Sequence, residues 1–449
     1  MASGFITRRD FLKLGAAVMA TMSLGRRAAW AQAVPASLWM NTLFHGGDAQ
    51  AMERIITKFN EENKDWAFIT LTQGQWEVYY SQLVNAAIAG NPPQIGICHT
   101  NRLPQIEAAL TPLENSPAGD LIAAAGIEAG NYLPTLWEGG VYKGVRYLIP
   151  LDTHMWGTWY NKDLFEKAGL DPENPPDTLE EFEAAADAIA STGKYAFHPA
   201  DIGKSRHIRR AWFILFWQMG GELFDEGYTK ATFNDEKGLA ALEYLVSIVT
   251  PKGEKVKGTD VAGKGWNMPG TDGNKQFTAG ELGMLWVGNW FYWTAKESGV
   301  NYSFHYIPKL FEKRVTWGNS HNLIIPKQAE GVSKDVYSAA IKAIKWINEN
   351  SDIWGIYGGH IPAYKPVFES EELKASETWQ VSLKKFVDMA TPVEEGGLGA
   401  FRYDIIHPKL GRILSAFEPP IEEAYNGTIS PKEALDKAEE AVNAVLAEE

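Results

Sequence analysis

Short polar clusters with histidine and carboxylate side chains follow several apolar runs along the chain. His45 and Asp48 follow the run 37–44, and Asn101 follows the run 94–98. In α/β sheets, ligands bind just beyond the carboxyl ends of the strands. Carboxylate, amide and imidazole groups at such positions can form the hydrogen bonds that ligand hydroxyl groups need. The pattern therefore predicts a binding cleft for a polar small molecule.

The same rule selects polar and aromatic residues beside other expected strands, at 145–149, 283–287 and 323–325. The candidate ligand-binding residues obtained in this way are His45, Asp48, Asn101, Asp152, His154, Trp156, Asn289, Trp290 and His321. Each has a structural alternative. Asp48 can be only a helix N-cap, Asp152 can merely pin the hinge, Trp290 can be a core residue behind the cleft, and the histidines can be satisfied by backbone groups.

Sequence motifs for catalysis are absent. The chain lacks Gly-x-Ser-x-Gly, His-Glu-x-x-His and a phosphate-binding Gly-x-x-x-x-Gly-Lys-Ser/Thr, and its nine histidines show no metal-ligand spacing. Its single cysteine, Cys98, excludes an intrachain disulfide and a multi-cysteine metal site. We therefore expect no catalytic residue, no metal site and no cofactor. Carboxylate pairs are common in an acidic chain, so a secreted carbohydrate-active hydrolase or lyase stays an alternative.

Composition narrows the class of partner. The 449 residues carry a formal net charge of −14, which argues against a nucleic-acid ligand. The length predicts two to four domains or one large two-lobed unit. The chain holds 17 tryptophans; most must pack in the core, as expected for Trp212, Trp217 and Trp346, while Trp39 and Trp156 stay undecided. The excess suggests a flat ligand with an apolar face.

Residues 1–33 resemble an export signal. Arg8 and Arg9 precede Phe-Leu-Lys, a short apolar run follows, and Ala31 to Ala33 form a small-residue cleavage pattern. The paired arginines are similar to those of the twin-arginine signal. No cysteine follows the apolar run, so we expect a soluble periplasmic protein without a lipid anchor. The segment is basic, so the rest of the chain is more acidic than the whole.

Alternating strands and helices indicate an α/β fold. A strand over 37–44, a helix from Asp48 and a strand over 68–71 form the first βαβ unit. Thr178 and Glu181 form a capping box that opens another helix, which we expect to end at Ala190.

An ordered series of motifs resembles a known family. The strongest segments are Gly144 to Leu151, Trp159 to Phe165 and Ala168 to Phe182, followed by Gln218 to Glu222, Ala231 to Asn234, Phe277 to Glu281 and Gly288 to Trp290. They are similar to the extracellular solute-binding proteins of ABC importers, in the sugar-binding group that includes maltose-binding protein. The resemblance covers essentially all of the chain after the signal.

The resemblance implies a two-lobed periplasmic binding protein of type II, in which each lobe is a mixed sheet flanked by helices and a hinged cleft lies between them. Lobe 1 would comprise 34–150 and 305–358, and lobe 2 would comprise 151–304 and 359–449. The implied partners are a carbohydrate, mono- or oligosaccharide, and the transmembrane permease subunits of an ABC transporter, which the protein would contact transiently as a monomer.

The resemblance also assigns roles within the cleft. Asn101 and His154 fall where the family has sugar-binding carboxylates, and Trp290 falls on a stacking tryptophan, whose indole face packs on a pyranose ring. In relatives, the loop that His198 and Arg209 bracket faces the cleft, and a ligand-binding arginine often occupies the position of Arg402.

The loop 201–210 departs from the maltose-binding pattern because it is basic. It either meets an anionic ligand, such as glycerol phosphate or a sugar acid, or is a solvated loop that offsets the acidic surface. Both interpretations stay open at this point.

Overall fold

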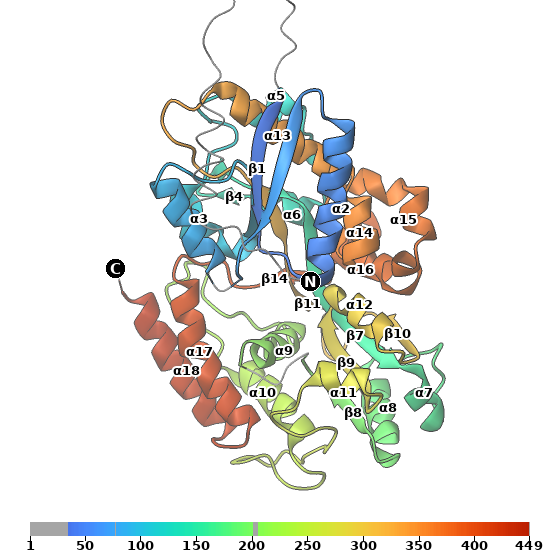
Figure 1. Ribbon diagram of the computed structural model, residues 1–449. Coiled ribbons are helices and arrows are strands. Elements are labelled where there is room, and N and C mark those ends of the chain that lie inside the picture. The colour runs from blue at the N-terminus through green and yellow to red at the C-terminus, as the bar shows by residue number, and fades with distance from the viewer. Residues whose placement is uncertain (1–34, 77, 201–204, 449) are drawn as a thin grey trace, which may run out of the picture.

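The computed structural model describes residues 35–76, 78–200 and 205–448, which form an upper and a lower lobe (Figure 1). The expected signal at 1–33 and residues 201–204 of the basic loop lie outside the described residues. Within the described part, no helix is long and apolar enough to cross a lipid bilayer.

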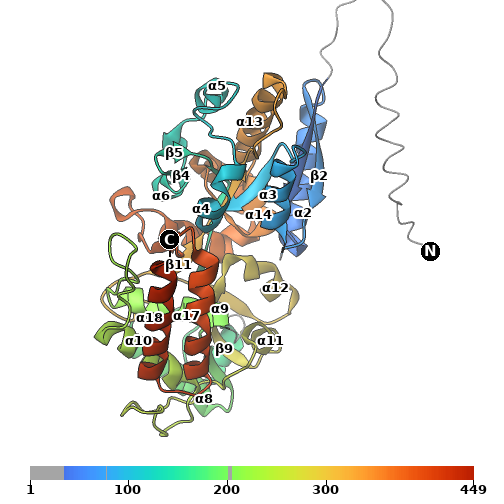
Figure 2. The ribbon, with the colours of Figure 1, turned by 90° about the vertical axis from the view of Figure 1, so that its left-hand side faces the viewer.

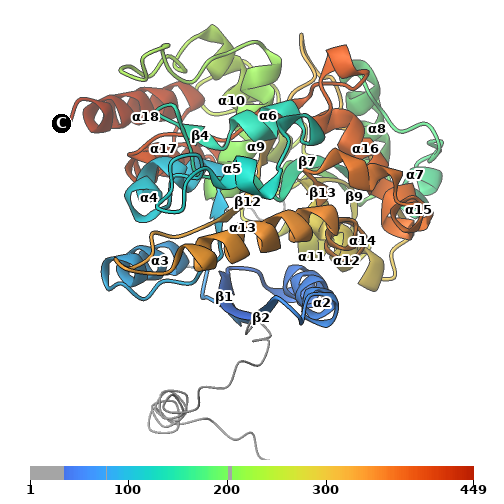
Figure 3. The ribbon, with the colours of Figure 1, turned by 90° about the horizontal axis from the view of Figure 1, so that it is seen from above.

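The upper lobe begins with the expected βαβ unit. Strands β1 (Ala36–Thr42) and β2 (Ala67–Gln73) pair in parallel, from Ala36 opposite Ala67 to Thr42 opposite Gln73. Helix α2 (Gly46–Glu62) connects them and buries Ile55 and Phe59, four residues apart on one face. Helices α13 (Lys334–Glu349) and α14 (Asp352–Gly358) pack beside α2 (Figure 3).

A second sheet of the upper lobe has the order β3 (Gly96–His99), β12 (His321–Ile324) and β6 (Ile149–Pro150). The central strand β12 pairs antiparallel with both β3 and β6. Residues from three distant segments thereby become neighbours.

The lower lobe is built on a mixed seven-stranded sheet whose centre is β7 (Asp152–Asn161), a strand buried along its whole length. Along the main path its order is β14 (Phe401–Tyr403), β11 (Thr316–Asn319), β7, β9 (Leu282–Gly288) and β8 (Tyr195–His198), while β10 (Tyr302–His305) and β13 (Ile361–Pro362) also pair with β7. The two-lobed α/β fold with mixed sheets is the predicted one.

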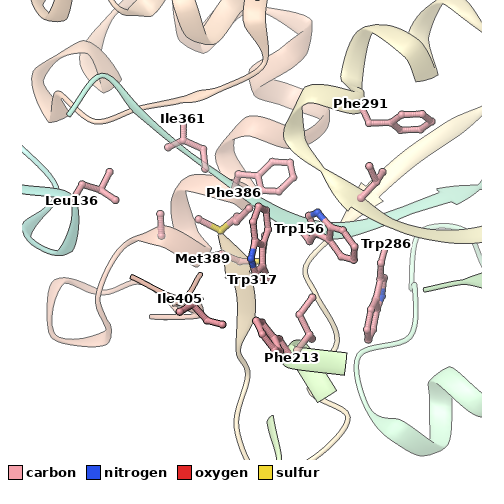
Figure 4. Packing of buried hydrophobic residues seen from close by; sticks show 14 of the residues in the cluster. Leu136, Trp156, Phe213, Trp286, Phe291, Trp317, Ile361, Phe386, Met389 and Ile405 are labelled. Carbon is pink, nitrogen blue, oxygen red and sulfur yellow. The ribbon is translucent and has the colours of Figure 1, made fainter. Parts of the chain in front are cut away.

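Helices cover the lower sheet. Helices α9 (Ser205–Gln218), α10 (Glu236–Val249), α17 (Leu410–Tyr425) and α18 (Pro431–Leu446) pack together on one side (Figure 2). Helix α8 (Leu179–Ser191) begins at the predicted Thr178–Glu181 capping box. Aromatic residues fill the core, including Trp156 and Phe213 (Figure 4) and the expected core residues Trp212 and Trp217.

The chain passes between the lobes at three places. It leaves β6 at Pro150 and enters β7 at Asp152, and it leaves β11 at Asn319 and enters β12 at His321. The third crossing joins α14, which packs on α2, to β13, which pairs with β7. The second crossing differs from the expected boundary at 305, because backbone pairing keeps β10 and β11 in the lower sheet.

Candidate functional site

A cavity of about 320 Å³ lies where the two lobes meet. The upper lobe contributes the segment between β1 and α2 and the edges of β3 and β12, and the lower lobe contributes β7, β11, α9 and the turn after β9. The lining residues are Leu43, Phe44, His45, Asp48, Trp76, His99, His154, His207, Arg210, Trp290, Trp317, His321 and His360. Six of the nine histidines of the chain therefore surround one cavity.

The structure brings five of the twelve predicted ligand-binding residues to this cavity, namely His45, Asp48, His154, Trp290 and His321. A sixth, Asp152, is fully buried directly behind it, within hydrogen-bond distance of His321. The polar clusters after β1 and at the start of β7 and β12 thus meet in space.

Three tryptophans form the apolar walls. The indole of Trp290 is nearly perpendicular to that of Trp317, with 6.5 Å between ring centroids. Trp76, whose surface is 42% exposed, meets the ring of His99 edge-on. The Arg210 guanidinium carbon lies 3.8 Å from the centroid of the Trp317 ring. Flat apolar faces beside hydrogen-bonding groups suit a ligand that has both C–H and hydroxyl surfaces.

The Gly288-Asn289-Trp290 turn has a clear structural logic. A Cβ atom on residue 288 would lie 2.0 Å from Cζ3 of Trp290, so only glycine lets the indole pack there. Asn289 is buried; its side chain accepts from the Met155 amide at 3.1 Å and donates to the Gly359 carbonyl at 2.9 Å. Asn289 therefore positions the turn that carries Trp290, and it does not line the cavity.

Asp152 organises the polar floor. Its carboxylate accepts hydrogen bonds from the His321 backbone amide at 2.9 Å and from the Trp354 indole at 2.7 Å. The Nδ1 atom of His321 lies 2.7 Å from Oδ2, and that of His154 lies 3.4 Å from Oδ1. A buried carboxylate with these partners holds the rings in fixed orientations.

Burial and charge shift the pKa values of this floor in opposite directions. Burial alone would raise the pKa of Asp152, but His321 and His360 hold that pKa well below its ordinary value. Burial, assisted by His321, lowers the pKa of His154 to about 3. Burial would also lower the pKa of His360, but Asp48 and Asp152 raise it above its ordinary value.

Asp48 is not the N-cap of the helix that follows β1, which was the structural alternative for this residue. Helix α2 begins at Gly46, its N-cap is His45, which makes no side-chain cap hydrogen bond, and Asp48 lies in the first turn of the helix. The Asp48 carboxylate instead lies 3.0 Å from Nε2 of His360. One ligand atom from each of Asp152, His154, His321 and His360, a carboxylate oxygen or a ring nitrogen, lies within 4.8 Å of the other three, so this group has the composition and compactness to hold a metal ion.

Two predicted arginines lie outside the cavity. Arg209 is 1% exposed and forms a bidentate pair with Asp404, at 2.7 and 3.2 Å, and a third bond to Glu418. Arg402 lies on β14, where it pairs with Glu222 and covers the ring of Trp217.

Three other candidates also lie away from the lining. Trp156 is fully buried on β7 and packs near Trp317, and Asn101 is buried in the turn after β3. The Nδ1 atom of His198 accepts from the Ala200 amide at the end of β8. Of the undecided tryptophans, Trp39 donates to Thr72 and lies outside the cavity as well.

Several lining residues were missed from the sequence. His207 and Arg210 lie on α9, which begins at Ser205 and not in a loop as expected. They are three residues apart, so one helix face carries both while Arg209 points elsewhere. Helical periodicity places Arg209 and Arg210 on different faces of α9, but only the packing of the helix decides which face meets the cavity. Trp317 and His360 had no local signal, because strand pairing between distant segments brings them to the site.

A two-lobed fold with a ligand-sized cavity at the lobe junction is typical of binding proteins that close around a small solute. Residues 45–352 match the family of bacterial extracellular solute-binding proteins, and the chain belongs to this family.

Relatives agree with this assignment. The chain is 29% identical over 192 residues to the sn-glycerol-3-phosphate-binding periplasmic protein UgpB of Escherichia coli O6:K15:H31, a match that spans 40% of each chain. Similar solved structures are the cyclic alpha-maltosyl-1,6-maltose binding protein from Arthrobacter globiformis (22% identity, TM-score 0.71, 92% of this chain and 99% of that one) and UgpB from Mycobacterium tuberculosis in complex with glycerophosphocholine (16% identity, TM-score 0.71, 92% and 98%).

Proposed function

We propose that this protein is the substrate-binding component of an ABC importer and captures a carbohydrate in the cavity between its lobes. The observation that carries the proposal is the lining itself, where the indoles of Trp290 and Trp317 lie beside the polar groups of Asp48, His154 and His321. A ligand that touches both lobes favours the closed arrangement, which a permease can then recognise. The matched solute-binding family and the sugar named for the Arthrobacter globiformis protein support the proposal.

A thermal-shift screen over mono-, di- and oligosaccharides, sugar acids and glycerol phosphate tests it. A neutral sugar at 100 times its Kd should stabilise the protein by about 2.7 kcal/mol. Chromatography after incubation with stoichiometric protein should recover the sugar unchanged. Product formation would refute a binding protein in favour of a hydrolase or lyase, and a screen without any carbohydrate shift would refute the ligand class.

A second ligand class has its own supporting observation. Arg210 lines the cavity. The UgpB relatives are named for binding sn-glycerol-3-phosphate, which is an anion. An anionic polyol or sugar derivative would place its charge near this guanidinium. Affinity that falls steeply between low and high salt would favour the anion, because salt screens charge pairs more than stacking.

The cellular setting belongs to the same proposal. The protein acts in the periplasm as a monomer without enzymatic activity, after export through the twin-arginine pathway. Replacement of Arg8 and Arg9 by lysine should retain the protein in the cytoplasm, as cell fractionation would show. Processed protein in the periplasm of that variant would refute the export route.

A further inference from the structure

Four buried ligand-type side chains meet at the floor of the cavity. Asp152 and His154 lie at the start of β7, His321 begins β12, and His360 follows α14. Each offers a carboxylate oxygen or a ring nitrogen, and these atoms lie within 4.8 Å of one another. We propose that this cluster binds one divalent transition-metal cation of the Zn²⁺ type. The proposal goes beyond solute capture and does not depend on it.

The donor set suits such an ion. Three imidazoles and one carboxylate are nitrogen and oxygen ligands that Zn²⁺, Co²⁺ and Ni²⁺ bind well, whereas Ca²⁺ and Mg²⁺ prefer oxygen ligands alone. A tetrahedral ion with bonds of about 2.1 Å needs ligand atoms about 3.4 Å apart. The widest separation of 4.8 Å therefore has to close by about 1.4 Å, an adjustment within the reach of small side-chain rotations.

His360 is the most informative member. Its ring is 1% exposed, and its Nδ1 atom lacks a hydrogen-bond partner among the described residues, although it points at Asp152 Oδ2 from 3.5 Å. Its other nitrogen, Nε2, is held by Asp48 at 3.0 Å. A carboxylate on one ring nitrogen that leaves the other available is the arrangement that orients histidine ligands in metal sites.

The surroundings also orient the carboxylate ligand. Trp354 donates its indole N–H to Asp152 Oδ2 at 2.7 Å, and the backbone amide of His321 donates to Oδ1 at 2.9 Å. These bonds fix the plane of the carboxylate while its remaining lone pairs face the imidazoles.

A metal ion bound by this cluster would affect how the two lobes are connected. Asp152 follows the first lobe crossing, His321 follows the second and His360 lies in the third. One ion bound to all four side chains would join the three crossing segments at a single point. Metal binding would thereby stiffen the connection on which lobe movement depends.

The test uses the full chain, stripped with EDTA and dialysed. Titration calorimetry with Zn²⁺ should give one ion per chain, and Co²⁺ should give the intense visible bands of a four-coordinate ion. His360→Gln should weaken Zn²⁺ binding at least tenfold. His407→Gln is the matched control, because this histidine lies outside the cavity, and it should leave the affinity unchanged.

Absence of stoichiometric Zn²⁺ binding, or a Co²⁺ spectrum typical of six water ligands, would overturn the proposal and leave a hydrogen-bonded hinge. Equal Zn²⁺ affinities of the wild type and a His360→Gln variant with a native circular-dichroism spectrum would overturn it too. The stoichiometry and the Co²⁺ spectrum of the wild type decide the outcome if this variant misfolds. A carbohydrate titration of the metal-free protein tests the proposed function separately.

Discussion

Arg209 and Arg402 offer a paired test of burial against ligand contact, because both pair with carboxylates and both were candidate ligand-binding residues. Arg209→Met removes a 1% exposed guanidinium and leaves Asp404 and Glu418 without their cation. Breaking a buried ion pair on one side costs about 3–5 kcal/mol, since a charge stays buried without compensation. Arg402→Met breaks a pair whose side chains are 35% and 63% exposed, which costs about 1 kcal/mol or less.

Urea unfolding followed by tryptophan fluorescence measures both losses. The free energy of unfolding should fall several times more for Arg209→Met than for Arg402→Met, with ligand affinity unchanged in both. Adding Asp404→Asn to Arg209→Met should recover part of the loss, because one orphaned carboxylate disappears.

Equal losses in the two variants would refute the burial argument. Reduced ligand affinity of Arg209→Met with unchanged stability would return Arg209 to the binding site.

Two further predictions concern the site, and a third concerns stability in acid. Trp290→Ala should weaken ligand binding at least tenfold, measured by calorimetry, with Trp39→Ala as the control that keeps the affinity. Gly288→Ala should also weaken binding, because its Cβ displaces the Trp290 indole; unchanged affinity and fluorescence would contradict this. Burial would raise the pKa of Asp177, but hydrogen bonds from His305 and Arg314 lower it to about 2. Its stabilising effect is thus complete above about pH 4 and is lost as the pH falls toward 2; Asp177→Asn should flatten the acid arm of a stability profile over that range.

Local sequence patterns predicted much of the fold. Alternation predicted β1 and β2 and their parallel pairing through α2, and the Thr178–Glu181 pair placed the start of α8. These features depend on neighbours in the chain, so sequence spacing determines them. The second lobe crossing depends instead on the pairing of β11 with β7 and β14, which no local pattern contains.

In the candidate site, too, local sequence predicted some residues, while others depend on tertiary packing. The rule on strand ends selected His45, Asp48, His154, Trp290 and His321, which the structure gathers around one cavity. Arg209 and Arg210 are adjacent in sequence, yet the rotation of α9 against α17 buries the first and turns the second to the cavity. The rotation of a helix about its axis is set by tertiary packing, so a basic run alone could not separate the two.

The cavity and the lobe crossings occupy the same place, so a ligand bound in the cavity would lie beside the segments that join the lobes. The Asn289 side chain joins β7 at Met155 to Gly359 in the third crossing, and the next residue, Trp290, lines the cavity. These two hydrogen bonds tie the residue next to Trp290 both to β7 and to the third crossing. A ligand that also contacts Asp48 on the upper lobe stabilises one lobe arrangement by its differential affinity, which is the physical requirement for a closure that ligand controls.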